Sequence, residues 1–344
     1  MDKKFLFEML KTMSVSGDEF TLTSKIIKYG NEIFEKVETD HVGNVVMSIN
    51  NQSPYKIMLF GHMDEIGLVV SKILNDGRAK VAGVGSITPY IYVGQRVRIS
   101  TKKGIIFGVI AKIKKDTTYI DEDLILDIGS FSYEETSKLI SIGDKVVLDH
   151  DYVELNKNIL AARALDDKIG VITLIEVLRN LKDKIDCGVY GCASVGEETT
   201  KNGALFSARK IKPNIAIAID VTSDTTTLSG VSSNSSEVKL NNGPTLTIGT
   251  TMNKVLTNLI IKIAKENNIN LQTNYCIYRT YTDADAVHYI DTGIPTILLS
   301  IPLRYMHGAG ELISYNDVED LIKLLTLFIT EISRNKITNF NCHE

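Results

Sequence analysis

Several apolar stretches of this chain run directly into side chains that bind metal ions well. The polar residues that follow them are His62, Asp64, Glu197-Glu198, Asp220 and His307. Short apolar, β-branched runs predict buried strands of an α/β sheet. Ligands of open α/β sheets bind at the carboxyl ends of the strands, so distant residues can meet there. With Asp166 added, two histidines and several carboxylates suit a pair of Zn²⁺-like ions that share one carboxylate.

Two of these motifs suggest particular roles. In His62-x-Asp64, the carboxylate can accept from the second imidazole nitrogen and so orient a metal-binding histidine. In Glu197-Glu198, neighbouring side chains of extended backbone point to opposite sides. One glutamate can therefore bind a metal while the other acts as general base. Taken alone, each motif also fits an ordinary strand end or a solvated loop.

The remaining candidates have structural alternatives as well. Asp166-Asp167 precedes a predicted helix, where acidic residues commonly cap the helix and favour its dipole. Asp220 can cap the turn that follows its strand, and His307 can belong to a plain glycine-rich turn. A carboxylate at the end of a buried strand is costly to desolvate unless it is paired or metal-bound. The combination therefore favours a metal centre, in which one carboxylate could bridge two ions with its two oxygens.

The composition limits the class of protein. The chain has 344 residues, 44% hydrophobic and 23% charged, which is ordinary for a globular protein of one large or two smaller domains. It has neither an apolar run long enough for a membrane span nor an apolar core for a signal peptide. The net charge of −4 argues against nucleic acid as a partner. The four cysteines form no CxxC pair, so reduced thiols in a cytoplasmic protein are expected, and Cys187 with Cys192 lacks partners for a zinc site.

The order of the elements predicts two domains. Helical spacing over 3–13 and 19–36 and strands over 42–49 and 57–60 begin an α/β domain. Short β-rich segments with glycine and charged turns fill 67–156, which predicts an inserted barrel or sandwich. Alternating strands and helices then resume, with strands expected near 188–194, 215–220, 236–240, 271–278 and 296–301. We therefore predict an α/β domain from 1–66 and 157–344, and a β-rich domain from 67–156.

In order along the chain, these motifs resemble those of the tetrahedral aminopeptidase and glutamyl aminopeptidase family. The resemblance covers nearly the whole chain, through Asp40-x-x-Gly43-Asn44, Gly61-His62-Met63-Asp64, Ala164-Leu165-Asp166-Asp167, Glu197-Glu198, Asp220-Val221-Thr222, Thr282-Asp283-Ala284 and Arg304-Tyr305-Met306-His307. It departs from the family after the glutamate pair, at Thr199-Thr200-Lys201-Asn202. The resemblance implies a phosphopeptidase-like α/β catalytic domain, a mixed sheet flanked by helices, with an inserted PDZ-like β-barrel domain used in assembly.

The resemblance also implies a ligand set. One ion is expected at His62, Asp166 and Asp220, and the other at Asp166, Glu198 and His307. Glu197 is expected as the general base, Asp64 as the partner of His62, and the Asp166–Asp167 peptide bond as cis. The ions are expected to be Zn²⁺ or Co²⁺, between which the ligand set does not choose.

The sequence thus predicts a cytoplasmic aminopeptidase that cleaves N-terminal residues from short peptides with a metal-bound hydroxide. The resemblance implies a homo-oligomer, a tetrahedral dodecamer. Two alternatives remain open: a related di-metal amidohydrolase, such as a deacylase or carboxypeptidase, or a metal-binding assembly protein that has lost turnover.

Overall fold

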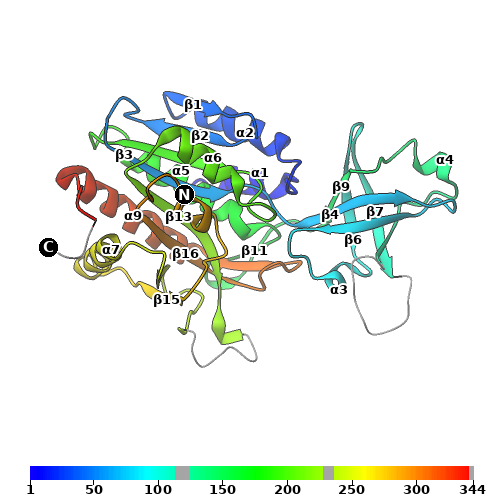
Figure 1. Cartoon of the computed structure of the whole chain (residues 1–344). Helices are drawn as coiled ribbons and strands as arrows, with labels where there is room; N and C mark the ends of the chain where they lie inside the picture. The colour runs from blue at the N-terminus through cyan, green and yellow to red at the C-terminus, as the bar shows by residue number, and fades with distance from the viewer. Residues whose placement is uncertain (113–123, 228–235, 341–344) are drawn as a thin grey trace.

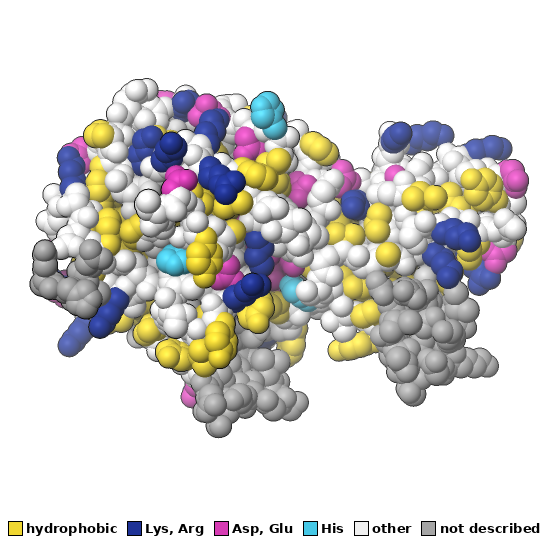
Figure 2. Space-filling view, in the orientation of Figure 1, with side chains coloured by type: hydrophobic (Ala, Val, Ile, Leu, Met, Phe, Trp, Pro, Cys, Tyr) yellow, Lys and Arg dark blue, Asp and Glu magenta, His cyan; other side chains and the backbone are white. Residues whose placement is uncertain are grey.

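A computed structural model describes residues 1–112, 124–227 and 236–340 of the protein. Within these ranges, the strands form one large mixed sheet and one separate closed barrel, which make two lobes side by side (Figure 1 and Figure 2). The large sheet has the order β1-β2-β12-β3-β13-β16-β17-β11-β10, with β14 beside β16 and β15 beside β14. The predicted fold class, an α/β domain with an inserted small β barrel, is confirmed.

The large sheet has parallel strands at its centre, where β12, β3, β13 and β16 are neighbours. Its strands are β1 (Lys36–Thr39), β2 (Val45–Ile49), β3 (Lys56–His62), β10 (Val153–Glu154), β11 (Ile159–Ala162), β12 (Gly188–Ser194), β13 (Ile215–Ser223), β14 (Thr245–Gly249), β15 (Gln272–Cys276), β16 (Thr296–Arg304) and β17 (Glu311–Ser314).

The strand predicted over 236–240 is wrong. The Val238 N–H donates to the Thr225 hydroxyl at 2.9 Å, and the Val238 carbonyl accepts from the Thr225 N–H at 2.9 Å. These bonds hold the segment against the short 3-10 helix η3 (Thr225–Thr227), so the segment does not join a strand ladder.

Helices cover both faces of the large sheet. The face with the larger core carries α1 (Lys3–Lys11), α2 (Phe20–Asn31), α5 (Leu165–Leu181), α7 (Lys254–Glu266) and α9 (Tyr315–Asn335). The other face carries α6 (Asn202–Ile211) and α8 (Ala284–Val287). β3 contributes side chains to both cores because successive side chains of a strand point to opposite faces. Ile57 and Leu59 lie in the larger core, and Met58 and Phe60 lie in the smaller one.

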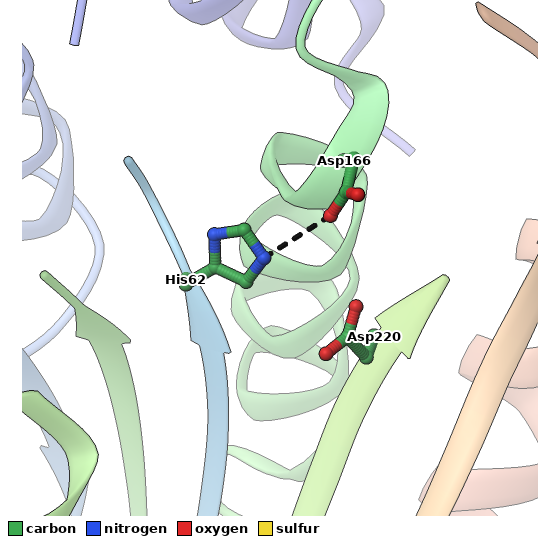
Figure 3. A group of neighbouring side chains, drawn as sticks. All are labelled: His62, Asp166 and Asp220. Atoms are coloured by element: carbon green, nitrogen blue, oxygen red, sulfur yellow. Dashed lines mark hydrogen bonds and ion pairs between the residues drawn. The ribbon is translucent and has the colours of Figure 1, made fainter. Parts of the chain in front are cut away.

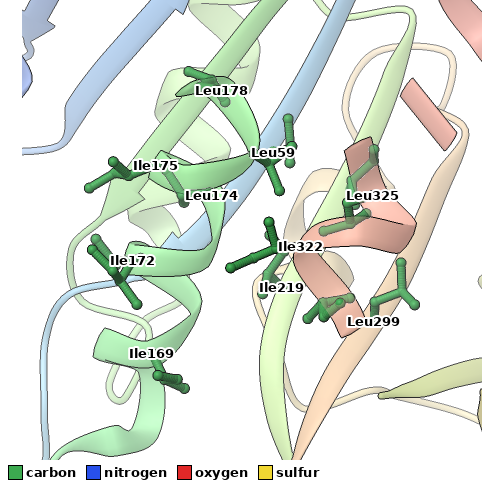
Figure 4. Close-up of a cluster of buried hydrophobic side chains, with 14 of the residues drawn as sticks. Leu59, Ile169, Ile172, Leu174, Ile175, Leu178, Ile219, Leu299, Ile322 and Leu325 are labelled. Carbon is green, nitrogen blue, oxygen red and sulfur yellow. The ribbon is translucent and has the colours of Figure 1, made fainter. Parts of the chain in front are cut away.

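Helix α5 is the centre of the larger core (Figure 4). Apolar side chains occur on nearly all sides of it, including Ile172, Leu174, Ile175 and Leu178, and such a helix must be buried. It packs against β3, β13 and α9. A helix fixed so firmly gives a rigid base to Asp166 and Asp167, which lie at its start with non-helical backbone angles.

The barrel closes in the order β4-β5-β8-β7-β6-β9 around its own apolar core. Its elements are β4 (Gly67–Ile73), β5 (Ala79–Val84), α3 (Pro89–Tyr92), β6 (Arg96–Thr101), β7 (Gly104–Lys112), β8 (Leu124–Asp127), α4 (Tyr133–Thr136) and β9 (Lys145–Leu148). All of them lie inside the predicted insertion 67–156. β10, which falls in the same range and precedes the short helix η2 (Asn156–Asn158), pairs with the large sheet instead. The domain bounds of 1–66 with 157–344 and of 67–156 stay a prediction, and these strand positions support it. In the described ranges, no helix is both long and apolar enough to cross a membrane.

Candidate active site

The candidate residues lie at one edge of the large sheet, at the carboxyl ends of its central strands. β3 ends at His62, which is opposite Ser194 at the end of β12, and Asp220 lies in the last half of β13. Glu197 and Glu198 follow β12, and His307 follows β16. Asp166 enters the same region from the start of α5. The topology therefore brings together residues that are far apart in the sequence, as parallel strands are expected to do.

Two groups of potential metal ligands share Asp166. His62, Asp166 and Asp220 form one group, and Asp166, Glu198 and His307 form the other; in each, the ligand atoms lie within 4.8 Å of one another. Figure 3 shows the first group, with Asp166 at the start of α5 facing His62 at the end of β3, and Asp220 on β13 below them. The Asp166 Oδ1 atom lies 3.1 Å from His62 Nε2, and Oδ2 lies 3.3 Å from His307 Nε2. Each oxygen of Asp166 thus faces a different histidine, which is the arrangement that a bridging carboxylate requires.

Asp64 organises the opposite side of His62. The His62 Nδ1 atom lies 3.4 Å from Asp64 Oδ1, so Nε2 is the ring nitrogen that faces the ligand group. The fully buried Asp64 carboxylate also accepts from the backbone N–H groups of Glu197 at 3.0 Å and Glu198 at 3.2 Å. Ser16 donates its hydroxyl to the same carboxylate. One side chain therefore fixes both the histidine and the backbone of the glutamate pair.

Glu197 lies beside the two ligand groups without belonging to either. Its Oε2 atom is 3.9 Å from His62 Nε2, and its side chain is almost completely buried. Its Oε1 atom contacts the Lys201 ammonium, which also donates to the Tyr281 carbonyl at 2.7 Å. One carboxylate oxygen is thus held by a cation while the other faces the cluster. Sequence reasoning missed this contact, because Glu197 and Lys201 lie in the turn before α6 and not within a helix, where a spacing of four would predict it.

Two further carboxylates that sequence reasoning gave no role support the site. Glu311 accepts from the Asp166 N–H at 3.1 Å and from the His307 N–H at 2.9 Å, so it fixes the backbone of one residue from each ligand group. Asp40 accepts from the Asn44 side-chain amide at 2.7 Å, and the Asn44 carbonyl oxygen accepts from the Val195 N–H at 3.0 Å. This second chain of bonds supports the segment that leads to Glu197.

Negative charge dominates the buried site. Burial raises the pKa of Asp220 well above its ordinary value, and the nearby Asp166 and Glu197 add to this. Burial and Asp166 likewise raise the pKa of Glu311 to about 8. Burial lowers the pKa of His307, but Asp166 and Glu198 outweigh it and bring the pKa to about 11. Burial and the crowding of carboxylates explain these shifts: both disfavour the ionised form of Asp220 and Glu311, whereas the carboxylates favour the protonated imidazole of His307.

This donor set fits divalent cations. Imidazole nitrogen and carboxylate oxygen are ligands of Zn²⁺ and related ions, and positive ions would relieve the repulsion among the carboxylates. The cysteines do not contribute, because the ligand groups found among the described residues contain only histidine and carboxylate. Cys187, Cys192 and Cys276 are free and buried, and Cys342 lies outside the described residues. The peptide bond between Asp166 and Asp167 is cis, as the resemblance implied.

A parallel-centred sheet with helices on both faces, and with histidines and carboxylates at its carboxyl edge, is typical of metal-dependent hydrolases of mixed α/β fold. Comparison with known proteins makes this specific. A sequence profile of the M42 glutamyl aminopeptidase family matches residues 43–324. The chain belongs to this family, which confirms the predicted resemblance and the prediction of a peptidase.

Individual relatives agree with this assignment over their full lengths. The chain is 30% identical to a lysyl aminopeptidase of Pyrococcus furiosus, and the match covers 96% of this chain and 98% of the relative. Its structure is similar to that of a TET aminopeptidase from a marine sediment archaeon, with a TM-score of 0.92, 27% identity and 99% coverage of both chains. It is also similar to the TET1 peptidase of Pyrococcus horikoshii, with a TM-score of 0.83, 30% identity and coverage of 94% and 98%.

Proposed function

We propose that this protein is an aminopeptidase that removes N-terminal residues from short peptides with two divalent metal ions. The main support is the position of Asp166, whose two carboxylate oxygens face His62 and His307 at 3.1 and 3.3 Å. A carboxylate placed in this way can join two ions into one centre. Family membership supports the peptidase activity, and the buried excess of negative charge supports the ions.

In this proposal, His62, Asp166 and Asp220 hold one ion, and Asp166, Glu198 and His307 hold the other. Zn²⁺ and Co²⁺ both suit this donor set. When bound, such ions polarise the scissile carbonyl and make a water molecule acidic enough to attack it near neutral pH.

The residues around the ligands have distinct roles in the proposal. Glu197 takes a proton from the attacking water through Oε2 and later delivers it to the leaving amine. Asp64 keeps the Nε2 atom of His62 directed at the centre, and its bonds to the N–H groups of Glu197 and Glu198 fix the base relative to a ligand. Most of these side chains are buried, so water screens their charges weakly and the electrostatic interactions between them are strong.

We also propose that the protein works as a homo-oligomer, with a dodecamer as the expected size and the cytoplasm as the expected location. The structure of the related Pyrococcus horikoshii peptidase is described as a tetrahedron or a large octahedral shell. On the barrel, Ile105, Phe107 and Val109 alternate along β7 and are exposed by 53%, 61% and 44%. Apolar side chains in such a row favour docking to another subunit. Light scattering that shows a stable monomer would contradict the oligomer but not the activity.

The activity is tested by reconstituting the purified full-length protein with Zn²⁺ or Co²⁺ and screening aminoacyl anilides. We expect hydrolysis that is lost with a chelator and restored by metal. Cleavage of N-acylated amino acids but not of anilides would favour a deacylase instead. Two ions per chain with no hydrolysis of either substrate under varied pH and metal would favour an assembly protein and refute the proposal.

A further inference from the structure

Lys201 lies beside the proposed base, in the turn between β12 and α6. Its ammonium group contacts Oε1 of Glu197 and donates to the Tyr281 carbonyl at 2.7 Å. The chain departs from the family pattern in this turn, at Thr199-Thr200-Lys201-Asn202, so family membership assigns Lys201 no role. A role for this lysine therefore has to follow from its contacts.

The pair of Lys201 and Glu197 differs from an ordinary ion pair at the surface. Their side chains are exposed by 30% and 7%, whereas those of Lys262 and Glu266, an i,i+4 pair on α7, are exposed by 65% and 58%. An exposed pair such as the second one is screened by water and contributes little. The first pair is screened much less because Glu197 is almost completely buried, so the ammonium acts strongly on this carboxylate.

Lys201 keeps its positive charge in this position. Burial lowers the pKa of its ammonium group, but Glu197, Asp283 and Asp220 outweigh burial and raise the pKa above its usual value. These carboxylates belong to the turn after β12, to the start of α8 and to β13. The ammonium therefore lies among carboxylates of three segments that are far apart in the sequence.

Hydrogen bonds hold the backbone at both ends of the Lys201 side chain. The Gly196 carbonyl accepts from the Lys201 N–H at 2.9 Å. At the other end, the Asp285 carboxylate accepts from the Tyr281 N–H at 3.0 Å. Lys201 therefore joins the turn that carries the base to a second segment, 280–285, at the start of α8.

Contact with Lys201 makes the two oxygens of Glu197 different. The terminal torsion of a glutamate side chain is broad, so a carboxylate that nothing holds can turn. With Oε1 held by the ammonium, Oε2 is the oxygen that faces the ligand groups, 3.9 Å from His62 Nε2. The action of a base depends on such placement, since an error of about 1 Å can cost about 10²-fold in rate.

We propose that Lys201 is a positioning residue for the reaction, which holds the base in place and ties it to the segment 280–285. The proposal rests on the proposed aminopeptidase function, with Glu197 as the base. In this role Lys201 acts through Glu197 and transfers no proton itself. Loss of its ammonium group should therefore slow the chemical step more than it weakens substrate binding.

The kinetics of the metal-reconstituted full-length protein with alanine p-nitroanilide test this role. Lys201→Met removes the ammonium but keeps a side chain of similar length, and it should lower kcat by about tenfold or more while KM changes by less than about threefold. Lys201→Arg keeps a cation and should retain most of the wild-type kcat. The matched control is Lys262→Met, which breaks an exposed pair of the same spacing and should leave kcat and KM unchanged. Elemental analysis should find the same metal content in all four proteins.

Hydrogen–deuterium exchange of the metal-free proteins gives a readout that does not need activity. Loss of the bond from Lys201 to the Tyr281 carbonyl should speed exchange in peptides that cover 280–285. Lys201→Arg and Lys262→Met should exchange there as the wild type does. If the wild type cleaves no anilide, the proposed function fails together with the role of Glu197, and the exchange data alone decide whether Lys201 joins the two segments.

Three results would overturn the proposal. The first is an unchanged kcat in Lys201→Met when the wild type is active. The second is unchanged exchange over 280–285 in that variant. The third is a loss of kcat that is accompanied by loss of metal and is as large in Lys201→Arg, which would indicate that Lys201 only supports the structure.

Discussion

A buried cluster of charges beside the active site gives a sharp prediction about stability. Glu65, which lies between His62 and the barrel, contacts the Arg163 guanidinium and accepts from Lys168 Nζ at 3.0 Å. It also accepts from the Ser14 N–H at 2.9 Å. All three charged side chains are buried. The variant Glu65→Gln replaces the carboxylate that balances two buried cations with a neutral amide. The amide N–H₂ group is a donor, and the groups around it are donors as well.

The size of the effect follows from the pKa of Glu65. Burial raises this pKa, but Arg163 and Lys168 outweigh burial and lower it from 4.5 to about 2. At about 1.4 kcal/mol for each pH unit, the carboxylate contributes about 3 kcal/mol at pH 7. Breaking a buried ion pair by removing one partner costs about 3–5 kcal/mol, which agrees. The contribution of an acid with a lowered pKa is complete above its unfolded pKa of 4.5 and is lost as the pH falls through about 2.

The contribution of Glu65 to the free energy of unfolding can be measured by urea denaturation followed by circular dichroism. EDTA is present, and the protein concentrations are equal. Glu65→Gln should lower the free energy of unfolding by about 3 kcal/mol at pH 7 and by about half of that at pH 3. The control is Glu134→Gln, since Glu134 is exposed on α4 and should stay within about 0.5 kcal/mol of the wild type. A Glu65→Gln variant as stable as this control, or a loss that does not shrink at low pH, would refute the reasoning.

Three other predictions concern the metals, the base and pH. Glu197→Gln should keep its metal content while kcat falls by about 10²–10⁴; an unchanged rate would remove Glu197 as the base. Asp166→Ala should lose both ions and His62→Ala mainly one, as elemental analysis of each variant would show; two ions retained by Asp166→Ala rule out bridging. Burial raises the pKa of Asp317 to about 6 despite backbone hydrogen bonds. Its contribution to stability is therefore complete below pH 3.8 and lost as the pH rises through about 6, and Asp317→Asn should flatten that slope in denaturation curves.

The sequence was sufficient to predict the fold class and the meeting of the candidate residues. Both follow from local patterns, because buried strands such as Ile215–Ile219 show as apolar runs and parallel strands carry their end residues to one edge. The segment 236–240 was misjudged because its alternating pattern resembles a strand, whereas bonds to Thr225 hold it in an irregular conformation.

The supporting residues could not be predicted in the same way. Asp64 was expected to orient His62, but its bonds to the N–H groups of Glu197 and Glu198 depend on a loop that approaches from a different strand. The bonds from the N–H groups of Asp166 and His307 to Glu311 also depend on how separate segments pack. Glu311 and Asp166 are 145 residues apart, so no local pattern in the sequence indicates their contact. The sequence indicates the residue types that can bind metal and the ends of the strands. Hydrogen bonds between loops depend on how the loops pack, which the sequence does not indicate.

Asp64 and Glu311 together suggest how the site keeps its shape. Each carboxylate binds backbone N–H groups of residues next to or within the ligand groups, and each is almost completely buried. Main-chain bonds of this kind do not depend on the side-chain rotamers of the ligands, so the backbone of the ligands is held even when the side chains move. The rigidity of α5 and of the central strands adds to this, since packing there leaves few alternative positions. We therefore expect the fold to set the positions of the proposed ligands, so that metal binding would need only small side-chain adjustments.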